Sequence, residues 1–223
     1  MTLAPVRYVA ALLMTTQRWA APALILVGLI AWVWVTPPVG IDTVRIALIV
    51  QFGLASWLGH AAATAEDVGQ ELISTSCHGS ATGLLVAKWA TAAGLAAGFP
   101  LILVVGTWLA GLPVAQRGEQ PPLTGDQAWA SLVAVLVVAV AGAVLGVLVA
   151  SVLPGHPGWA ATVLILAGLT QAVPNGVPVP ILAAALPEAG RPIGSDMVVA
   201  LAVAPLLSAG LLIAARLLRR SAG

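Results

Sequence analysis

The sequence predicts an all-α membrane protein: one transmembrane domain, residues 1–223, with six transmembrane helices. Two observations lead to this prediction. Apolar residues make up 60% of the 223-residue chain and charged residues only 8%, whereas a soluble domain carries about 25% charged residues. The few charges also fall in clusters, and the charge-free segments between them are long enough to cross a bilayer.

Helix is the expected element, because a chain in lipid must satisfy its backbone hydrogen bonds internally and these segments lack the alternating pattern of a membrane barrel. The predicted membrane helices cover residues 19–36, 44–61, 84–110, 128–152, 158–175 and 197–217. Before them, residues 3–17 are bracketed by Arg7 and Arg18. This segment is expected to be an amphipathic helix lying flat on the membrane, or an extension of the first helix. The motifs GLAAG (94–98) and GAVLG (142–146) predict close packing between helices.

Both termini are expected on the cytoplasmic side. Six of the nine basic residues then lie inside, as the positive-inside rule requires. All eight tryptophans fall near a predicted interface, the level in the bilayer that indole rings prefer. A single lysine beside many arginines, with abundant Ala, Val and Gly, is typical of a GC-rich bacterial genome. The expected location is therefore a bacterial cytoplasmic (inner) membrane.

Residues 63–88 form a polar segment in this apolar chain. The segment holds three acids within six positions, together with the only lysine and the only cysteine. With both termini inside, it is the largest cytoplasmic loop. Glu66, Asp67 and Glu71 are expected on one short helix, since the spacings of four residues place polar side chains on a common face. Gly79 and the Ser/Thr/His cluster around it (STSCHGS, 74–80) are expected to break this helix. A solvated loop, whose acids only keep it out of the membrane, explains the same composition.

The stretch that contains this helix resembles the loop between the second and third helices of type-2 ABC exporter permeases. It reads EDVGQELISTSCHGSATGLLVAKW (66–89). In that family the loop has an acid, a glycine, a Glu-Leu pair, a Ser/Pro-rich turn and an apolar run entered through Gly-Lys or Ala-Lys. There it forms the coupling helix, which docks on a separate ATPase subunit. The resemblance implies this role for Glu66, Asp67, Gly69, Glu71, Leu72 and Ser76.

The family's helix count, flat N-terminal helix and long outer segment between helices five and six also fit. Residues 173–196 are rich in proline, and their apolar middle, 181–186, is too short to cross a bilayer. This segment is expected to be a re-entrant outer segment or an ordinary surface loop, and the resemblance implies that it forms the outer gate. The sequence departs from the family pattern in the turn, where the usual proline is replaced around Ser76-Cys77.

The expected partners follow from the lone lysine and from the helix count. Lys88 lies in VAKWA and not in the Gly-Lys-Ser/Thr motif of a phosphate-binding loop. We therefore expect no cofactor in this chain, with ATP and magnesium bound by a separate ATP-binding subunit. Six helices are half of a full exporter, so a second permease copy or a homologous permease chain is the other expected partner. The net charge of +1 gives no indication of nucleic-acid binding.

Polar residues inside the predicted membrane helices are candidates for lining a transport pathway, because in lipid they are costly unless they face a cavity or another helix. The candidates are Gln51, Thr107, Gln171 and Asn175. For Gln51, a hydrogen bond between helices is the alternative. No ionisable group is expected mid-membrane, which favours an apolar or amphipathic cargo, such as a drug, antibiotic, peptide or lipid, over ion-driven transport.

Two other functions remain open. A haem-exporter-type permease has a similar length and loop pattern, although no histidine is predicted near the outer surface to ligate haem. A non-transporting membrane sensor or immunity subunit fits the composition equally well. An intramembrane enzyme is not expected, because the predicted helices hold no catalytic set of side chains.

Overall fold

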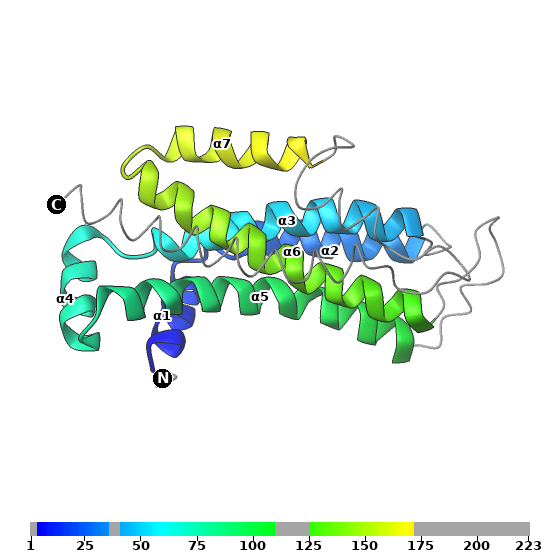
Figure 1. Cartoon of the computed structure of the whole chain (residues 1–223), viewed down its shortest axis with the longest axis horizontal. Coiled ribbons are helices and arrows are strands. Elements are labelled where there is room, and N and C mark those ends of the chain that lie inside the picture. The colour runs from blue at the N-terminus through cyan, green and yellow to red at the C-terminus, as the bar shows by residue number, and fades with distance from the viewer. Residues whose placement is uncertain (1–3, 36–40, 110–124, 172–223) are drawn as a thin grey trace.

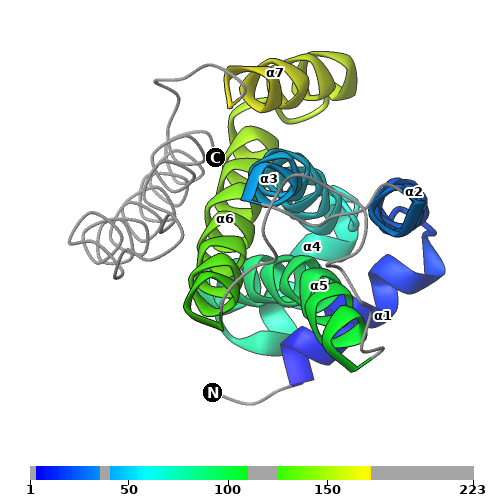
Figure 2. The ribbon, with the colours of Figure 1, turned by 90° about the vertical axis from the view of Figure 1, so that its right-hand side faces the viewer.

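The computed structural model describes residues 4–35, 41–109 and 125–171, and within these ranges every element is an α-helix. The helices are α1 (Ala4–Thr15), α2 (Ala20–Val35), α3 (Ile41–Ala63), α4 (Val68–His78), α5 (Ala81–Leu109), α6 (Gly125–Val152) and α7 (Pro157–Thr170). Helices α2, α3, α5 and α6 run along the length of the molecule, whereas α1 and α4 lie crosswise at one end (Figure 1). Viewed end-on, α3, α5 and α6 form the centre, with α2 and α7 at the periphery (Figure 2).

The first five predicted membrane helices correspond to α2, α3, α5, α6 and α7. Two stretches, Ile46–Ala63 of α3 and Trp129–Val152 of α6, are long and apolar enough to cross a membrane. The predicted helix at 197–217 and the outer segment at 173–196 lie outside the described residues. Six crossings therefore remain a prediction, while the helical fold class is confirmed for the described part of the chain.

The N-terminal segment is a separate helix and not an extension of the next one. Helix α1 ends at Thr15, and the turn that follows contains Gln17 with a φ of 53°. Few residues other than glycine adopt this left-handed conformation, so it marks a true break in the helix. Val9 and Leu13, which lie four positions apart, are fully buried on one face, while Arg7 on the other face is exposed. Helix α1 therefore has one face that is buried against the bundle, while its predicted position flat on the membrane stays a prediction.

Helices α3 and α6 approach each other closely at three glycines. A Cβ added to Gly142 would lie 2.7 Å from the Phe52 carbonyl oxygen, and one added to Gly146 would overlap the backbone of Ser56. Gly59 makes the reciprocal contact from α3, against Ala143. The packing predicted for GAVLG is confirmed. By contrast, no described atom lies within 4 Å of a Cβ added to Gly94 or Gly98, so the prediction for GLAAG has no support in the described residues.

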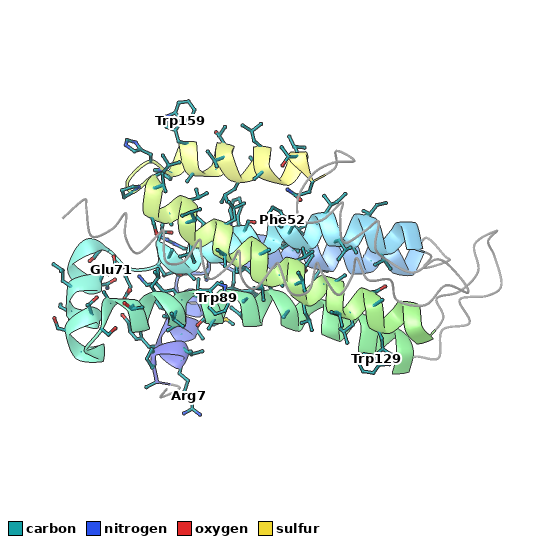
Figure 3. All side chains as sticks on the ribbon, in the orientation of Figure 1. Arg7, Phe52, Glu71, Trp89, Trp129 and Trp159 are labelled. Carbon is teal, nitrogen blue, oxygen red and sulfur yellow. The ribbon has the colours of Figure 1, made fainter. Side chains whose placement is uncertain are left out.

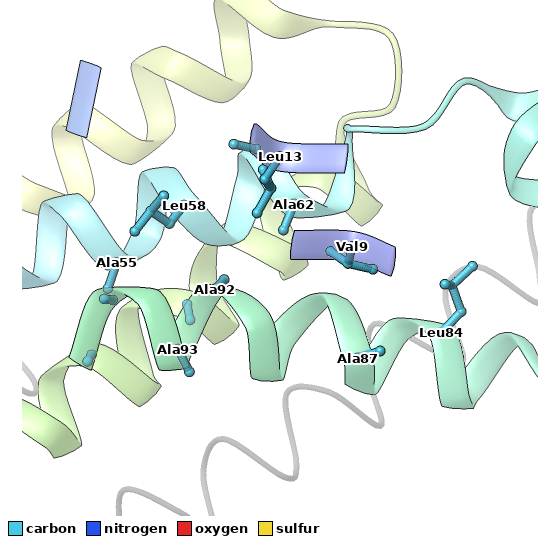
Figure 4. Packing of buried hydrophobic residues seen from close by; sticks show 13 residues of the cluster. Val9, Leu13, Ala55, Leu58, Ala62, Leu84, Ala87, Ala92 and Ala93 are labelled. Atoms are coloured by element: carbon cyan, nitrogen blue, oxygen red, sulfur yellow. The ribbon is translucent and has the colours of Figure 1, made fainter. Parts of the chain in front are cut away.

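The core around these contacts is built largely from alanine. Val9 and Leu13 of α1 lie over Leu58 and Ala62 of α3, and the cluster continues into Ala92 of α5 (Figure 4). Small side chains allow helix backbones to pack closely, as is common between membrane helices. Helix α1 is thus held against the bundle by its own apolar face.

Large apolar side chains remain exposed on the two peripheral helices. They include Leu24, Ile25 and Val27 on α2, and Trp159, Ile165, Leu166 and Leu169 on α7. A monomeric soluble protein rarely leaves so many neighbouring apolar side chains in water. Together with the two apolar spans, these surfaces favour a membrane protein.

Candidate functional site: a short helix anchored by a buried ion pair

Helix α4 connects α3 to α5 and lies at the end of the bundle, across its long axis (Figure 1). Asp67 is its N-cap: the Asp67 carboxylate accepts a hydrogen bond from the Gln70 backbone N–H at 2.7 Å, and the Gln70 side chain accepts one from the Asp67 N–H. Such a capping box satisfies backbone donors that a helix start leaves open. Gly79 ends the helix with a φ of 69°, a conformation that glycine adopts without strain.

This geometry confirms one part of the sequence prediction and corrects another. Gly79 ends the helix as predicted. The prediction that the Ser/Thr/His cluster breaks it is wrong, because the helix continues to His78 and Ser76 donates a hydrogen bond to the Leu72 carbonyl oxygen within it. The placement of Glu66 and Asp67 inside the helix is wrong, because the helix begins at Val68. Asp67 caps the helix from outside, since a short carboxylate competes well for the free N–H groups of the first turn. Glu66 precedes the cap and turns into the protein.

The exposed surface of α4 carries two large apolar side chains. Leu72 is 68% exposed and Ile73 is 67% exposed, although both lie on a short helix at the end of the molecule. Gly69 and Ser76 are also exposed. Two adjacent branched aliphatic side chains in this position lose contact with water only if another surface covers them. Helix α4 therefore presents a small apolar contact surface, formed by Leu72 and Ile73.

Beneath α4 lies a buried ion pair. The Lys88 Nζ of α5 lies 2.8 Å from the Glu66 Oε2, and the two side chains are 1% and 0% exposed, respectively. Glu71 of α4 approaches the same ammonium group at 3.3 Å, but its side chain is 34% exposed. Lys88 thus joins the α3–α4 linker, α4 and α5 at one point. Figure 3 shows Glu71 at the end of the bundle.

Two hydroxyl groups complete the surroundings of the Glu66 carboxylate. Tyr8 of α1 donates a hydrogen bond to Glu66 Oε1 at 2.9 Å, and Ser74 of α4 donates one to the same atom at 2.5 Å. Hydrogen bonds to an ionised carboxylate are stronger than those between neutral groups. A single buried carboxylate therefore connects α1 with α4 and α5, although Tyr8 of α1 lies 58 positions before Glu66 in the sequence. We call Tyr8, Glu66, Ser74 and Lys88 the anchor cluster.

The charge state of the anchor cluster follows from these contacts. Burial alone would raise the pKa of Glu66, but the hydrogen bonds from Lys88, Ser74 and Tyr8 and the charge of Lys88 outweigh burial and lower the pKa. For Tyr8, the hydrogen bond with Ser74 acts to lower the pKa, but burial and the Glu66 carboxylate prevail and raise it. At neutral pH, Glu66 is ionised and the Tyr8 phenol is protonated, so the phenol donates to the carboxylate.

The predicted site residues fall into two groups. The six predicted docking residues lie together on α4 and on the linker directly before it. The pathway candidates do not form a comparable cluster. Gln51 is buried and donates a hydrogen bond to the Ala96 carbonyl oxygen of α5 at 2.6 Å, the interhelical bond that was its alternative role. Gln171 is buried at the end of α7 and donates to the Ala167 carbonyl oxygen at 3.1 Å.

The other two pathway candidates, the Thr107 side chain and Asn175, lie outside the described residues. Sequence reasoning missed the roles of Tyr8 and Ser74. It noted Lys88 only as the sole lysine, although a lone lysine beside a membrane helix is itself a signal of a paired charge. Within the described ranges, no group of three or more His, Cys, Asp or Glu side chains is placed to hold a metal ion.

No family model matches the chain, and no curated protein and no solved structure shows significant similarity to it. The site must therefore be interpreted from its own geometry. It is a short helix at one end of a helical bundle, held by a buried ion pair and presenting two exposed apolar side chains, Leu72 and Ile73.

Proposed function

We propose that this chain is the membrane-embedded permease subunit of an ATP-driven exporter, and that α4 docks on a separate ATP-binding subunit. The observation that carries the proposal is the combination at α4 of an exposed apolar surface, Leu72 and Ile73, with a buried ion pair beneath it. A helix that served only to connect α3 and α5 in water would need neither feature. A helix that transmits force to a partner needs a contact surface and a stiff attachment.

The resemblance of residues 66–89 to permease coupling loops supports the same function. In the proposed arrangement, both termini and α4 lie on the cytoplasmic side of a bacterial inner membrane. A second permease copy, or a homologous chain, completes the transporter. The cargo is apolar or amphipathic.

The anchor cluster provides a mechanism for coupling. When ATP binding draws the partner subunits together, the force acts on Leu72 and Ile73. Separating Glu66 from Lys88 in the protein interior costs about 3–5 kcal/mol. The contacts of the anchor cluster therefore stay intact under this force, while weaker contacts between helices change. Helix α4 then moves as a unit with α1 and the start of α5. The close α3–α6 packing at Gly142 and Gly146 is a separate contact, against which this unit can move.

The proposal is tested by co-purification from native membranes in mild detergent. Leu72→Ser combined with Ile73→Ser removes the apolar surface without touching the anchor cluster, and is therefore a cleaner change than Glu71→Arg, which would place a second cation beside Lys88. Met14→Ser is the matched control, because Met14 is an exposed apolar side chain on α1. We expect wild type and Met14→Ser to retain a partner that carries an ATP-binding loop, and the double variant to lose it. A chain that purifies alone, or with a partner lacking such a loop, would contradict the proposal.

A further inference from the structure

A groove of about 480 Å³ lies where the α1–α2 turn, the end of α3 and the α6–α7 turn meet. The apolar span of α3 ends at Ala63 and that of α6 ends at Val152. The groove lies beside both ends, since its lining includes Ala61 of α3 and Leu153, just after α6. In a membrane, the ends of apolar spans lie at the level of the lipid headgroups. This location does not depend on any ATP-binding partner.

The groove is lined by one arginine and two histidines, beside the uncharged polar side chains of Gln17 and Thr64. Arg18, His60 and His156 come from three different parts of the chain and line the same space. None of the described residues that line the groove is acidic. Arg18 Nη1 donates to the backbone oxygen and to the Oγ1 of Thr64, which fixes the guanidinium group at the rim without neutralising its charge. The standing positive charge of the groove is that of Arg18, and no described carboxylate lines the groove to offset it.

The walls of the groove are apolar and continue onto the outer surface. Trp57 lines the groove and is partly exposed, while Ala61 and Leu153 form further apolar wall. Indole rings favour the headgroup level of a bilayer. Helix α7 begins at the edge of the groove with no side-chain cap on its first N–H groups, so the positive end of its dipole adds to the basic field. Beyond it, α7 presents exposed apolar residues, including Trp159 (Figure 3).

From this combination we propose that the groove binds the phosphate headgroup of an anionic phospholipid, with Arg18 and His156 facing the phosphate and the acyl chains lying along α7. Basic pockets between membrane helices on the cytoplasmic side are suited to such headgroups. The apolar wall favours a phospholipid over a free anion, because inorganic phosphate has no apolar group that could contact Trp57 and Leu153. A bound lipid here bridges α1, α3 and the α6–α7 turn.

The test measures lipid binding to the full chain, delipidated in mild detergent, by native mass spectrometry. Phosphatidylglycerol and phosphatidylcholine of the same acyl chains are titrated in parallel. A basic residue near an anionic headgroup contributes about fivefold to affinity, so we expect phosphatidylglycerol to bind several-fold more tightly. Arg18→Gln is expected to weaken its binding about fivefold, and His156→Glu to weaken it at least as much, with phosphatidylcholine binding unchanged in both.

Two controls separate lipid binding in the groove from general effects of losing a positive charge or of misfolding. Arg7→Gln removes an exposed arginine of α1 that does not line the groove, and is expected to bind both lipids like wild type. Arg18→Gln also removes the hydrogen bonds from Arg18 to Thr64, so a change in its lipid binding has two possible causes. His156→Glu removes no such hydrogen bond and therefore tests the groove alone. Circular dichroism checks the helical content of each variant. Equal affinity for the two lipids, wild-type binding by His156→Glu, or displacement of phosphatidylglycerol by inorganic phosphate would each overturn the proposal.

Discussion

Replacing Lys88 with methionine removes the cation from the anchor cluster while keeping a side chain of similar length. The Glu66 carboxylate is then left buried with only the hydroxyl groups of Tyr8 and Ser74 as partners. Removing one member of a buried ion pair costs about 3–5 kcal/mol, because the remaining charge is uncompensated. The contact between Lys88 and Glu71 adds little to the loss, since the partly exposed Glu71 regains water.

Protonation of Glu66 limits the size of this loss. The ordinary pKa of a glutamate side chain is 4.5, so protonating an unperturbed carboxylate at pH 7 costs about 3.4 kcal/mol at 1.36 kcal/mol per pKa unit. If leaving the charged carboxylate buried would cost more than this, Glu66 of the variant binds a proton instead, so the cost of protonation is the upper limit of the loss in stability. We therefore expect Lys88→Met to lower the free energy of unfolding by about 3 kcal/mol at pH 7. The loss should shrink at lower pH, where protonation costs less.

The assay is reversible unfolding of the full chain in mixed detergent micelles, followed by circular dichroism. Arg7→Met is the control, because it removes an exposed cation from α1 with the same change in side chain. Combining Lys88→Met with Glu66→Gln leaves no buried charge, and should restore stability to within about 1 kcal/mol of wild type. A loss below about 1 kcal/mol for Lys88→Met, the range of exposed ion pairs, would refute this reasoning, as would a double variant no more stable than the single one.

Three more predictions follow from the same contacts. Because the folded-state pKa of Glu66 is lowered, the ionised carboxylate contributes fully to stability above about pH 4.5, and this contribution is lost as the pH falls further. Thermal unfolding measured from pH 3 to 7 should therefore show a melting temperature that falls at low pH, and Glu66→Gln should reduce this pH dependence. Gly146→Ala should lower the free energy of unfolding in micelles by about 1–3 kcal/mol, because the added methyl group overlaps the backbone of α3. Gly94→Ala is the control and should be neutral or stabilising. Equal effects of the two substitutions would contradict the packing. Asp67→Ala should cost about 1 kcal/mol and speed hydrogen exchange in α4, while Asp67→Ser retains most protection; unchanged exchange would argue against the cap.

The parts of the fold that the sequence predicted are those with local or periodic signals. Charge-free segments predicted the membrane helices, and the segment between Arg7 and Arg18 was recognised as a possible separate helix, but its buried residues, Val9 and Leu13, came only from the structure. Gly79 could be recognised as a helix end because only a residue without a side chain adopts its conformation easily. The GAVLG motif was a correct packing signal, but GLAAG looks the same in sequence and makes no such contact with the described residues. Small residues permit close approach without specifying the partner.

The anchor cluster could not be derived from sequence because its contacts are long-range. Tyr8 reaches Glu66 across 58 positions, and Ser74 approaches Tyr8 across 66. Nothing in the local pattern around Tyr8 distinguishes it from an interfacial aromatic residue. The spacing of the acids predicted that Glu66 lies on the same helix as Asp67. In the structure the Glu66 side chain instead points into the protein, because it pairs there with the buried cation of Lys88. Desolvation and pairing, which depend on the folded protein, decided its position.

The most direct test of the docking role of α4 uses Cys77, the only cysteine of the chain, which is exposed on that helix. A thiol-reactive photocrosslinker attached to Cys77 in native membrane vesicles captures whatever lies against α4, and mass spectrometry identifies the adduct, with Cys77→Ser as the blank. We expect a captured chain that carries an ATP-binding loop, with labelling by an impermeant reagent only in inside-out vesicles. Labelling from the outer face, or adducts that contain no nucleotide-binding chain, would contradict the account.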